Sequence, residues 1–163
     1  MKIGLLSDTH STLDSRVFKH FENVDEIWHA GDVGNPEIVD QLEEFKPLVG
    51  VYGNIDNAEV RSHLPEFQRF EREGVSVLMT HIAGKPGRYS KRLSDEIKQN
   101  GVPKIIVCGH SHILLVKFDK HLNTLWLNPG ACGNHGFHKV KTMLRFDLIQ
   151  GDVKNMEVIQ WER

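Results

Sequence analysis

Residues 3–10 read IGLLSDTH, a short apolar run that stops at an aspartate and a histidine two positions apart. The apolar part, residues 3–6, has the length and composition of a buried strand, and residues 13–21 have apolar side chains at a helical spacing. The same order repeats farther along the chain, with a strand over 26–30, a helix over 36–45 that begins with a proline, and a strand over 48–52. This βαβαβ order predicts parallel strands with helices packed outside them.

The second half of the chain has a different pattern. Residues 67–71 and 75–80 predict a hairpin that turns at Glu73-Gly74, and residues 89–99 predict an amphipathic helix. A buried strand is expected over residues 104–108, followed by candidates for antiparallel strands over 114–118, 124–127, 140–148 and 153–161. Sheet packed on sheet with helices outside suits this pattern. With 163 residues and no linker, we expect one domain, residues 1–163.

Composition excludes several classes of protein. The formal net charge is -2, so no bulk field attracts the chain to nucleic acid or acidic lipid. No stretch approaches the roughly 18 apolar residues of a membrane span, and the first apolar run is too short for a secretory signal. We therefore expect a cytoplasmic protein. Cys108 and Cys132 form no CxxC pair and are expected to be small core residues.

Polar motifs follow five of the predicted strands directly. They are Asp8-Thr9-His10, Gly31-Asp32, Gly53-Asn54-Ile55-Asp56, Thr80-His81 and Gly109-His110-Ser111-His112. Ligands bind at the carboxyl ends of the strands in open α/β sheets, so these loops are expected to converge. On an extended backbone, side chains at i and i+2 point the same way, which would bring Asp8 to His10 and His110 to His112. A glycine before a ligand permits close approach of the backbone.

The residue types in these motifs suit a metal site. Carboxylate, imidazole and amide without thiolate favour Mn²⁺, Fe or Zn²⁺ over Cu(I) or an iron–sulfur cluster. Seven ligands are too many for one ion with an open position, but they fit two ions with one bridging carboxylate. Taken alone, each motif has an ordinary explanation, such as a helix N-cap, a turn or a semi-buried histidine. Five of them at strand ends need a common cause.

In its order of motifs, the chain resembles the calcineurin-like metallophosphoesterase superfamily, whose pattern is DxH, GD, GN, a histidine and GHxH. The compact size, the Gly-Asn-x-Asp form and Asn128-Pro129-Gly130 are similar to its small bacterial and archaeal phosphodiesterase branch, the YfcE-like family. The resemblance spans residues 3 to about 131. It implies an α/β fold, a four-layer αββα sandwich of two mixed sheets flanked by helices.

The resemblance also implies the ligands and the chemistry. One metal would be held by Asp8, His10 and His112, the other by Asn54, His81 and His110, with Asp32 bridging; the implied catalytic residues are Asp32, Asn54 and His110. The implied reaction is phosphoester hydrolysis, foremost of diesters, in which a hydroxide bridging two divalent ions attacks phosphorus in line. Manganese is expected first, with nickel, zinc or iron as alternatives. The expected partner is a small phosphoester substrate, and homo-oligomer formation stays open.

One departure concerns the leaving group. Many members of the superfamily have a histidine after the GN asparagine that can protonate the leaving oxygen, and here that position is Ile55. General-acid help is worth about 10²–10⁴-fold, so its loss predicts modest activity or dependence on a good leaving group. Asp56 is expected to serve as a turn or hydrogen-bonding residue in this loop, and a catalytic role as the proton donor is the alternative.

The sequence leaves alternatives open for several basic residues and histidines, and for the choice between an enzyme and a binding scaffold. The basic residues after His81 either bind phosphate or form a solvated face, and they are Lys85, Arg88, Lys91 and Arg92. The two histidines after the NPG loop, His135 and His138, are expected at the surface, with the rim of the site as the alternative. The main alternative to an enzyme is a binding scaffold on the same fold, as in the Vps29 subunit of retromer. Loss of ligand residues would favour the scaffold; this chain keeps all seven, which favours the enzyme. The sequence identifies neither the physiological substrate nor a preference for diesters or monoesters.

Overall fold

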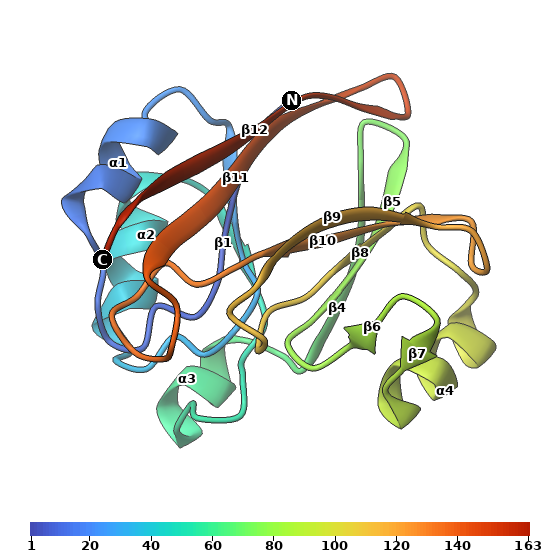
Figure 1. Ribbon diagram of the computed structural model, residues 1–163, viewed down its shortest axis with the longest axis horizontal. Coiled ribbons are helices and arrows are strands. Elements are labelled where there is room, and N and C mark those ends of the chain that lie inside the picture. Colours follow the sequence, from blue (N-terminus) through green and yellow to red (C-terminus); the bar gives the residue numbers. More distant parts are fainter.

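The computed structural model describes residues 1–163 as two five-stranded sheets packed face to face (Figure 1). The first sheet has the order β12-β11-β1-β2-β3, with β1 (Lys2–Leu6), β2 (Glu26–His29), β3 (Leu48–Gly50), β11 (Val140–Ile149) and β12 (Asp152–Glu162). The second has the order β4-β5-β8-β10-β9, with β4 (Phe67–Arg72), β5 (Val75–Thr80), β8 (Ile105–Val107), β9 (Leu114–Asp119) and β10 (Thr124–Pro129). Both sheets mix parallel and antiparallel pairs, as predicted.

Helices cover the outer side of each sheet. Figure 1 shows α1 (Ser15–Phe21) and α2 (Glu37–Phe45) outside the first sheet and α4 (Lys91–Asn100) outside the second. The short helix α3 (Ala58–His63) and the ribbon of β6 (Gly84–Lys85) and β7 (Arg88–Tyr89) lie at one end of the molecule. The four layers of the predicted αββα sandwich are therefore present. No helix is long and apolar enough to cross a membrane.

Alternating side chains on the strands build three cores between the four layers. Ile3 and Leu5 on β1 point between the sheets, into a cluster with Val77 of β5 and Leu127 of β10. Leu6 faces the opposite way, toward the helices of the first sheet, and the third cluster joins α4 to the second sheet. Burial of alternate residues on both faces of a strand is what a central layer of a sandwich requires.

Capping side chains set the starts of three helices. Asp14, Asn57 and Ser90 accept hydrogen bonds from the backbone N–H groups of Arg16, Val60 and Leu93. α1 and α4 therefore begin two residues later than predicted, and α2 begins at Glu37 because Pro36 is its N-cap rather than its first helical residue. The sequence analysis missed α3, which buries only Val60, and the exposed β6–β7 ribbon.

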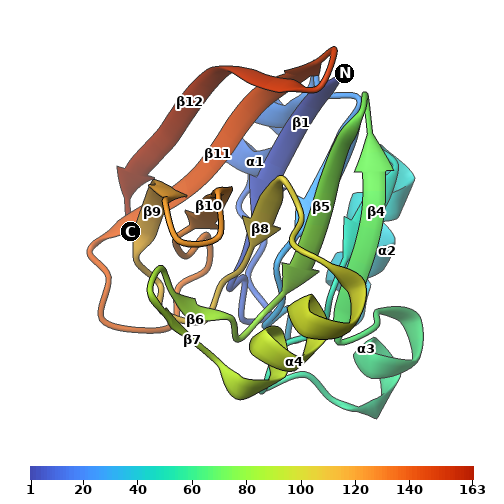
Figure 2. The ribbon, with the colours of Figure 1, turned by 90° about the vertical axis from the view of Figure 1, so that its right-hand side faces the viewer.

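Parallel strands from both sheets end at the same edge of the molecule. β1, β2 and β3 run parallel within the first sheet, and β5 and β8 run parallel within the second. Figure 2 shows the loops after β1, β5 and β8 at the lower end of these strands. The five polar motifs occupy the segments that follow these strands, as the sequence predicted.

Candidate metal centre

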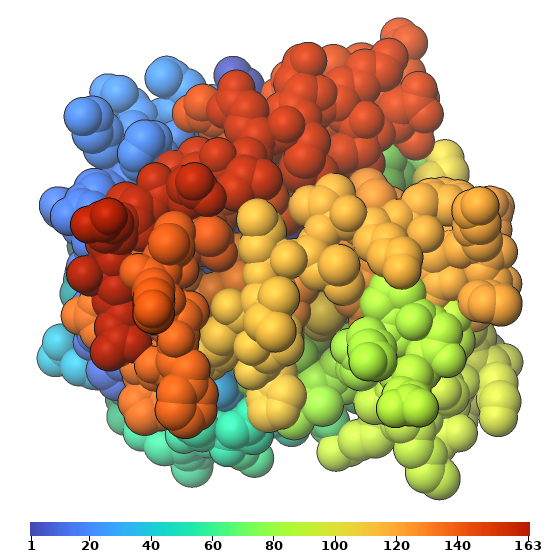
Figure 3. Space-filling view, viewed as in Figure 1, coloured from blue at the N-terminus to red at the C-terminus, as the bar shows by residue number.

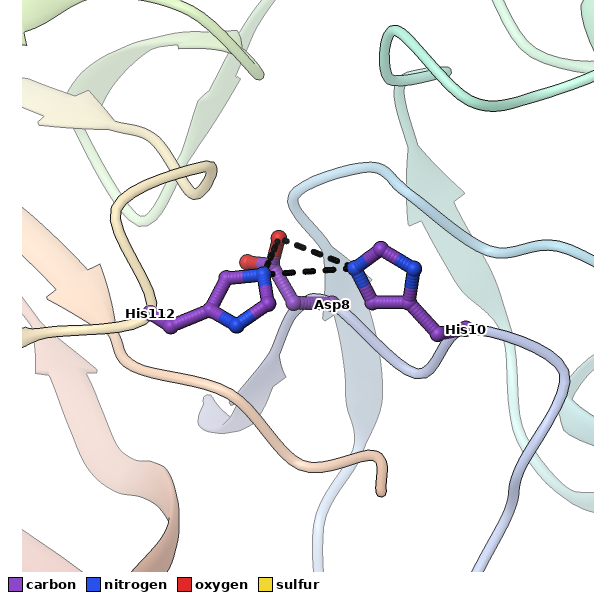
Figure 4. Close-up of side chains that lie close together, drawn as sticks. All are labelled: Asp8, His10 and His112. Atoms are coloured by element: carbon purple, nitrogen blue, oxygen red, sulfur yellow. Dashed lines mark hydrogen bonds and ion pairs between the residues drawn. The ribbon is translucent and has the colours of Figure 1, made fainter. Parts of the chain in front are cut away.

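Six of the seven predicted ligands form two adjacent groups. The ligand atoms within each group lie within 4.8 Å of one another, and the groups are Asp8, His10 and His112, and Asp32, His81 and His110. Figure 4 shows the first group, in which His112 Nε2 lies 3.1 Å from Asp8 Oδ1 and 3.2 Å from His10 Nε2. The seventh, Asn54, is exposed and lines two hollows, one with His81 and the other with Asp32 and His110.

Asp32 faces both groups. Its Oδ2 atom lies 3.6 Å from Nε2 of His10, and its Oδ1 atom lies 3.2 Å from Nε2 of His81. The backbone N–H of Ile55 donates to Oδ1 at 3.1 Å, which fixes the orientation of the carboxylate. A carboxylate that presents one oxygen to each group has the arrangement expected of a bridging ligand.

Two buried polar atoms in the centre have no hydrogen-bond partner, namely Asp8 Oδ1 and His81 Nε2. Nδ1 of His81 lies 2.8 Å from the carbonyl oxygen of Ala30, and because a carbonyl can only accept, Nδ1 must carry the proton. In the neutral ring, Nε2 then directs its lone pair at the carboxylate of Asp32. Two acceptors that face each other in a buried site need a proton or a cation between them. The nitrogen and oxygen donors fit a divalent metal ion here.

Burial and the contacts between carboxylates and imidazoles shift the pKa values of the residues in the centre. Burial opposes a charged His81, but the carboxylates of Asp32 and Asp8 outweigh it and raise the pKa of His81. The contact with Asp8 raises the pKa of His112 despite its burial. Burial likewise opposes ionisation of Asp32, yet His81 and other donors hold the pKa of this carboxyl below its ordinary value. Burial lowers the pKa of His10. A bound metal would take the place of protons on these ligands.

Five of the predicted ligands have a left-handed backbone. The φ angles are 55° at Asp8, 44° at His10, 55° at Asp32, 69° at His110 and 57° at His112. Such a conformation costs roughly 1 kcal/mol per residue that is not glycine, and strain of this kind gathers at functional sites. The prediction of an extended backbone in these motifs was therefore wrong. The prediction that His110 and His112 reach one point together was also wrong, because the two histidines belong to different groups.

The glycines of the motifs make room for ligands from other loops. A Cβ atom on Gly53 would overlap Oδ1 and the backbone nitrogen of Asp32, and one on Gly109 would overlap the side chains of Ser7 and Asp8. A Cβ on Gly31 would lie 2.7 Å from Nδ1 of His81. The predicted close approach is confirmed, since no other residue fits these positions without moving a ligand.

Asp56 is a structural residue of the centre. Its buried carboxylate accepts the backbone N–H groups of Val33 at 3.1 Å, Gly34 at 2.7 Å and Gly53 at 2.7 Å. These bonds join the loop after β2 to the loop after β3. The predicted hydrogen-bonding role is confirmed, and a carboxylate committed to three donors is unsuited to donating a proton.

His29 supports the ligand loops through hydrogen bonds that no sequence motif predicted. This buried histidine accepts the N–H of Gly31 at Nδ1, at 3.1 Å, so its Nε2–H faces Thr9 Oγ1, also at 3.1 Å. Thr9 Oγ1 in turn donates to the carbonyl of Val33. Burial lowers the pKa of His29 to about 4, so the ring is neutral and ties the first two ligand loops together. Its position at the end of the EIWH strand was the only sequence signal.

The NPG loop supports the GHSH segment. Asn128 donates from Nδ2 to the carbonyl of Gly109 at 2.8 Å and to Ser111 Oγ at 3.2 Å. Cys108 and Cys132 are buried, as predicted, and burial raises the pKa of each thiol to about 12.

The segment after the NPG loop forms the rim of the centre. The ring of exposed His135 lies 4.7 Å from that of His10, and the ring of half-buried His138 lies 5.4 Å from that of His112. Phe137 between them is fully exposed. Figure 3 shows this segment, between β10 and β11, beside the loop between β8 and β9 on one face of the molecule. Both line a cleft of about 600 Å³ with the ligands.

The basic residues after His81 lie either on a solvated helix face or beside a hollow. Lys91 pairs with Asp95 on the surface of α4, at 2.9 Å, and is part of a solvated face. Arg92 instead lines a hollow next to Asn54 and His81. Lys85 and Arg88 line a third hollow, beside Ser111 and Ile113.

Two adjacent groups of nitrogen and oxygen ligands at the strand ends of a four-layer sandwich define a class of metal-binding α/β protein. The chain matches the model of the calcineurin-like phosphoesterase superfamily domain over residues 1–151. It is 34% identical over 139 residues to a probable metallophosphoesterase of Methanocaldococcus jannaschii, covering 80% of this chain and 68% of that protein. The chain belongs to the calcineurin-like phosphoesterase superfamily.

Solved structures share the whole fold. An archaeal phosphodiesterase superposes with a TM-score of 0.78 and 21% identity, covering 99% of this chain and 100% of that chain. Vps29 of Entamoeba histolytica in complex with Zn²⁺ superposes with a TM-score of 0.74 and 13% identity, covering 99% of both chains. At these identities the likeness shows the fold alone, and it confirms the predicted sandwich.

Proposed function

We propose that this chain is a phosphodiesterase that uses two divalent metal ions, manganese foremost. Asp8, His10 and His112 would hold one ion, Asn54, His81 and His110 the other, and Asp32 both. The observation that supports this proposal best is the place of Asp32, which presents one oxygen to each group of ligands. When bound, two such ions neutralise charge on the phosphoryl oxygens and lower the pKa of a water molecule that can attack phosphorus.

The residues of the chain position these ligands and the substrate. The N–H of Ile55 holds the Asp32 carboxylate, and the carbonyl of Ala30 holds the His81 ring with Nε2 directed inward. Hydrogen bonds between the backbone and a metal ligand fix the orientation of that ligand. Ile55 lies 46% exposed in the cleft and has no proton to give, so a leaving group must depart without help from that side chain.

A substrate panel on metal-stripped protein tests the proposal. Bis(p-nitrophenyl) phosphate and p-nitrophenyl phosphate would each be supplied with Mn²⁺, Ni²⁺, Zn²⁺ or Mg²⁺. We expect hydrolysis only with added metal, and faster release of p-nitrophenol from the diester than from the monoester. The variant His110→Ala should lose most of this activity, whereas His121→Ala, an exposed histidine outside the centre, should not.

Metal binding by itself does not separate the enzyme from a scaffold, because a Vps29 structure also contains Zn²⁺. Turnover does. A protein that binds metal but cleaves neither ester with any of the four ions would support the scaffold and contradict the proposal.

A further inference from the structure

A second hollow adjoins the candidate metal centre. It has a volume of about 280 Å³ and lies between the loop after β3, α3 and the start of α4, all at the same end of the molecule in Figure 1. Asn54 lines both this hollow and the cleft of about 600 Å³ that contains His10, Asp32 and His110. A phosphodiester bound at the centre therefore has room for one ester arm in each space.

Arg61 supplies a fixed positive charge to the smaller hollow. Its Nε donates to the carbonyl of Asp56 at 2.7 Å, and its Nη2 donates to those of Asn54 at 3.3 Å and Gly53 at 3.5 Å. The guanidinium lies 4.6 Å from the centre of the Tyr52 ring. All its hydrogen bonds go to backbone carbonyls, so no carboxylate neutralises its charge, and Nη1 remains free to donate.

Arg92 supplies a second, movable positive charge. Its Nη2 lies 2.6 Å from Oε2 of Glu66, and its side chain is 72% exposed. An exposed ion pair of this kind adds little stability, so an incoming anion can replace Glu66 as the partner. Two guanidinium groups facing one space favour phosphate, whose oxygens accept paired N–H donors.

The two spaces differ in chemistry. The smaller hollow holds Arg61 and Arg92, whereas the larger cleft has apolar side chains at its mouth, with Ile113 67% exposed and Phe137 fully exposed. A charged arm suits the first, and an aromatic or apolar arm suits the second.

We propose that the hollow of Arg61 and Arg92 is a subsite for a phosphate or phosphonate group on the ester arm that stays attached to phosphorus. The substrate class is then a phosphodiester with one aromatic or apolar arm and one arm that ends in a second anion. This inference rests on the proposed phosphodiesterase function.

Two diesters with the same leaving group test the subsite. They are p-nitrophenyl propyl phosphate and p-nitrophenyl 3-phosphonopropyl phosphate, which differ only by the phosphonate group at the end of the retained arm. We expect the wild-type protein to have a kcat/KM about tenfold higher for the charged diester. Arg92→Gln should lower the ratio, because Arg61 is then the only guanidinium left in the hollow. Glu66→Gln, which removes the internal competitor for Arg92, should raise it. Lys91→Gln removes the same charge one position away, outside the hollow, and should keep the wild-type ratio.

Calorimetry separates failure of the subsite from failure of the proposed function. Metal-loaded protein would be titrated with propyl phosphate and with 3-phosphonopropyl phosphate. Tighter binding of the second, reduced in Arg92→Gln but not in Lys91→Gln, supports the subsite even if neither diester is cleaved. Equal Kd values, or a preference that Lys91→Gln and Arg92→Gln reduce alike, would overturn it.

Discussion

At the scale of single residues, Asp32 decides between a mononuclear and a dinuclear centre. Its two oxygens lie 3.6 Å from Nε2 of His10 and 3.2 Å from Nε2 of His81, and these histidines belong to different groups. The backbone N–H of Ile55, in the GNID loop, holds this carboxylate in place. Its carboxylate also raises the pKa of His81, against the opposing effect of burial.

Replacing Asp32 by Asn should therefore remove most of the hydrolysis and leave the fold intact. The amide keeps the shape but loses the charge that attracts two ions, and we expect a loss of about 10²-fold or more in kcat/KM at matched metal concentration. Circular dichroism would check the fold and steady-state kinetics the activity. Activity within a fewfold of wild type would show that Asp32 is not a ligand.

Ile55 gives a second test at the residue scale. Ile55 lines the cleft, and its side chain has no proton to donate. The carboxylate of Asp56 accepts hydrogen bonds from three backbone N–H groups, so it is unsuited to donate a proton. Aryl esters, whose leaving groups are weak bases, should be cleaved much faster than alkyl esters. Ile55→His should raise the alkyl rate more than the aryl rate, by less than the general-acid range of about 10²–10⁴ because nothing orients the new ring.

The comparison variant is Asp56→Asn. We expect it to slow both classes of ester together, because it weakens the loop rather than removing an acid. A selective loss on alkyl esters alone would identify Asp56 as the donor and contradict our interpretation of Ile55.

At the scale of elements, strand-end loops in strained conformations hold the candidate ligands, and glycines let these loops pack closely. Gly53 gives the sharpest case, because a Cβ atom there would overlap Asp32. Gly53→Ala should therefore displace Asp32 and weaken metal binding by about tenfold or more. Gly87→Ala is the matched control. It has a φ of 79° and open space around it, so it should cost about 1 kcal/mol of stability without changing the metal affinity.

Metal affinity measured by dialysis, together with thermal unfolding, separates the two glycine variants. Equal loss of metal affinity in both would mean that the glycines act through stability and not through contact with a ligand.

Most of the helices and strands, and the position of the motifs at strand ends, could be predicted from the sequence. Apolar periodicity located the principal strands and helices, and the five motifs could be assigned to strand ends because each follows an apolar run. Helix α3 could not be found this way, since six residues with one buried side chain give no period, although Asn57 was available as a capping signal. The left-handed backbone of the ligands and the role of His29 depend on contacts between loops that are distant in sequence.

At the scale of the whole molecule, the centre joins the two sheets. Asp8, His10 and Asp32 follow strands of the first sheet, whereas His81, His110 and His112 follow strands of the second. Each group contains ligands from both sheets. Metal bound in either group would therefore link the two halves of the sandwich.

Metal should accordingly stabilise the fold. A ligand at 100 times its Kd adds about 2.7 kcal/mol, and for a chain of this size that raises Tm by about 5–10 °C. Scanning calorimetry of metal-stripped protein, with and without Mn²⁺, would measure the gain. An unchanged Tm at saturating metal would mean that the ions do not bind the folded centre.

The gain should also depend on pH. The raised pKa values of His81 and His112 mean that protonation stabilises the metal-free fold at low pH, an effect lost as pH rises through those values. Metal needs the same nitrogens deprotonated, so the increase in Tm should be smallest in acid and grow with pH. A gain that falls with rising pH would contradict this competition.

The number of ions bound per chain tests the dinuclear centre most directly. Metal-stripped protein would be dialysed against increasing Mn²⁺ and the bound metal determined by elemental analysis against protein concentration. The two groups of ligands, with Asp32 between them, predict two ions per chain at saturation. Saturation at one ion per chain would contradict the dinuclear centre and with it the bridging role of Asp32.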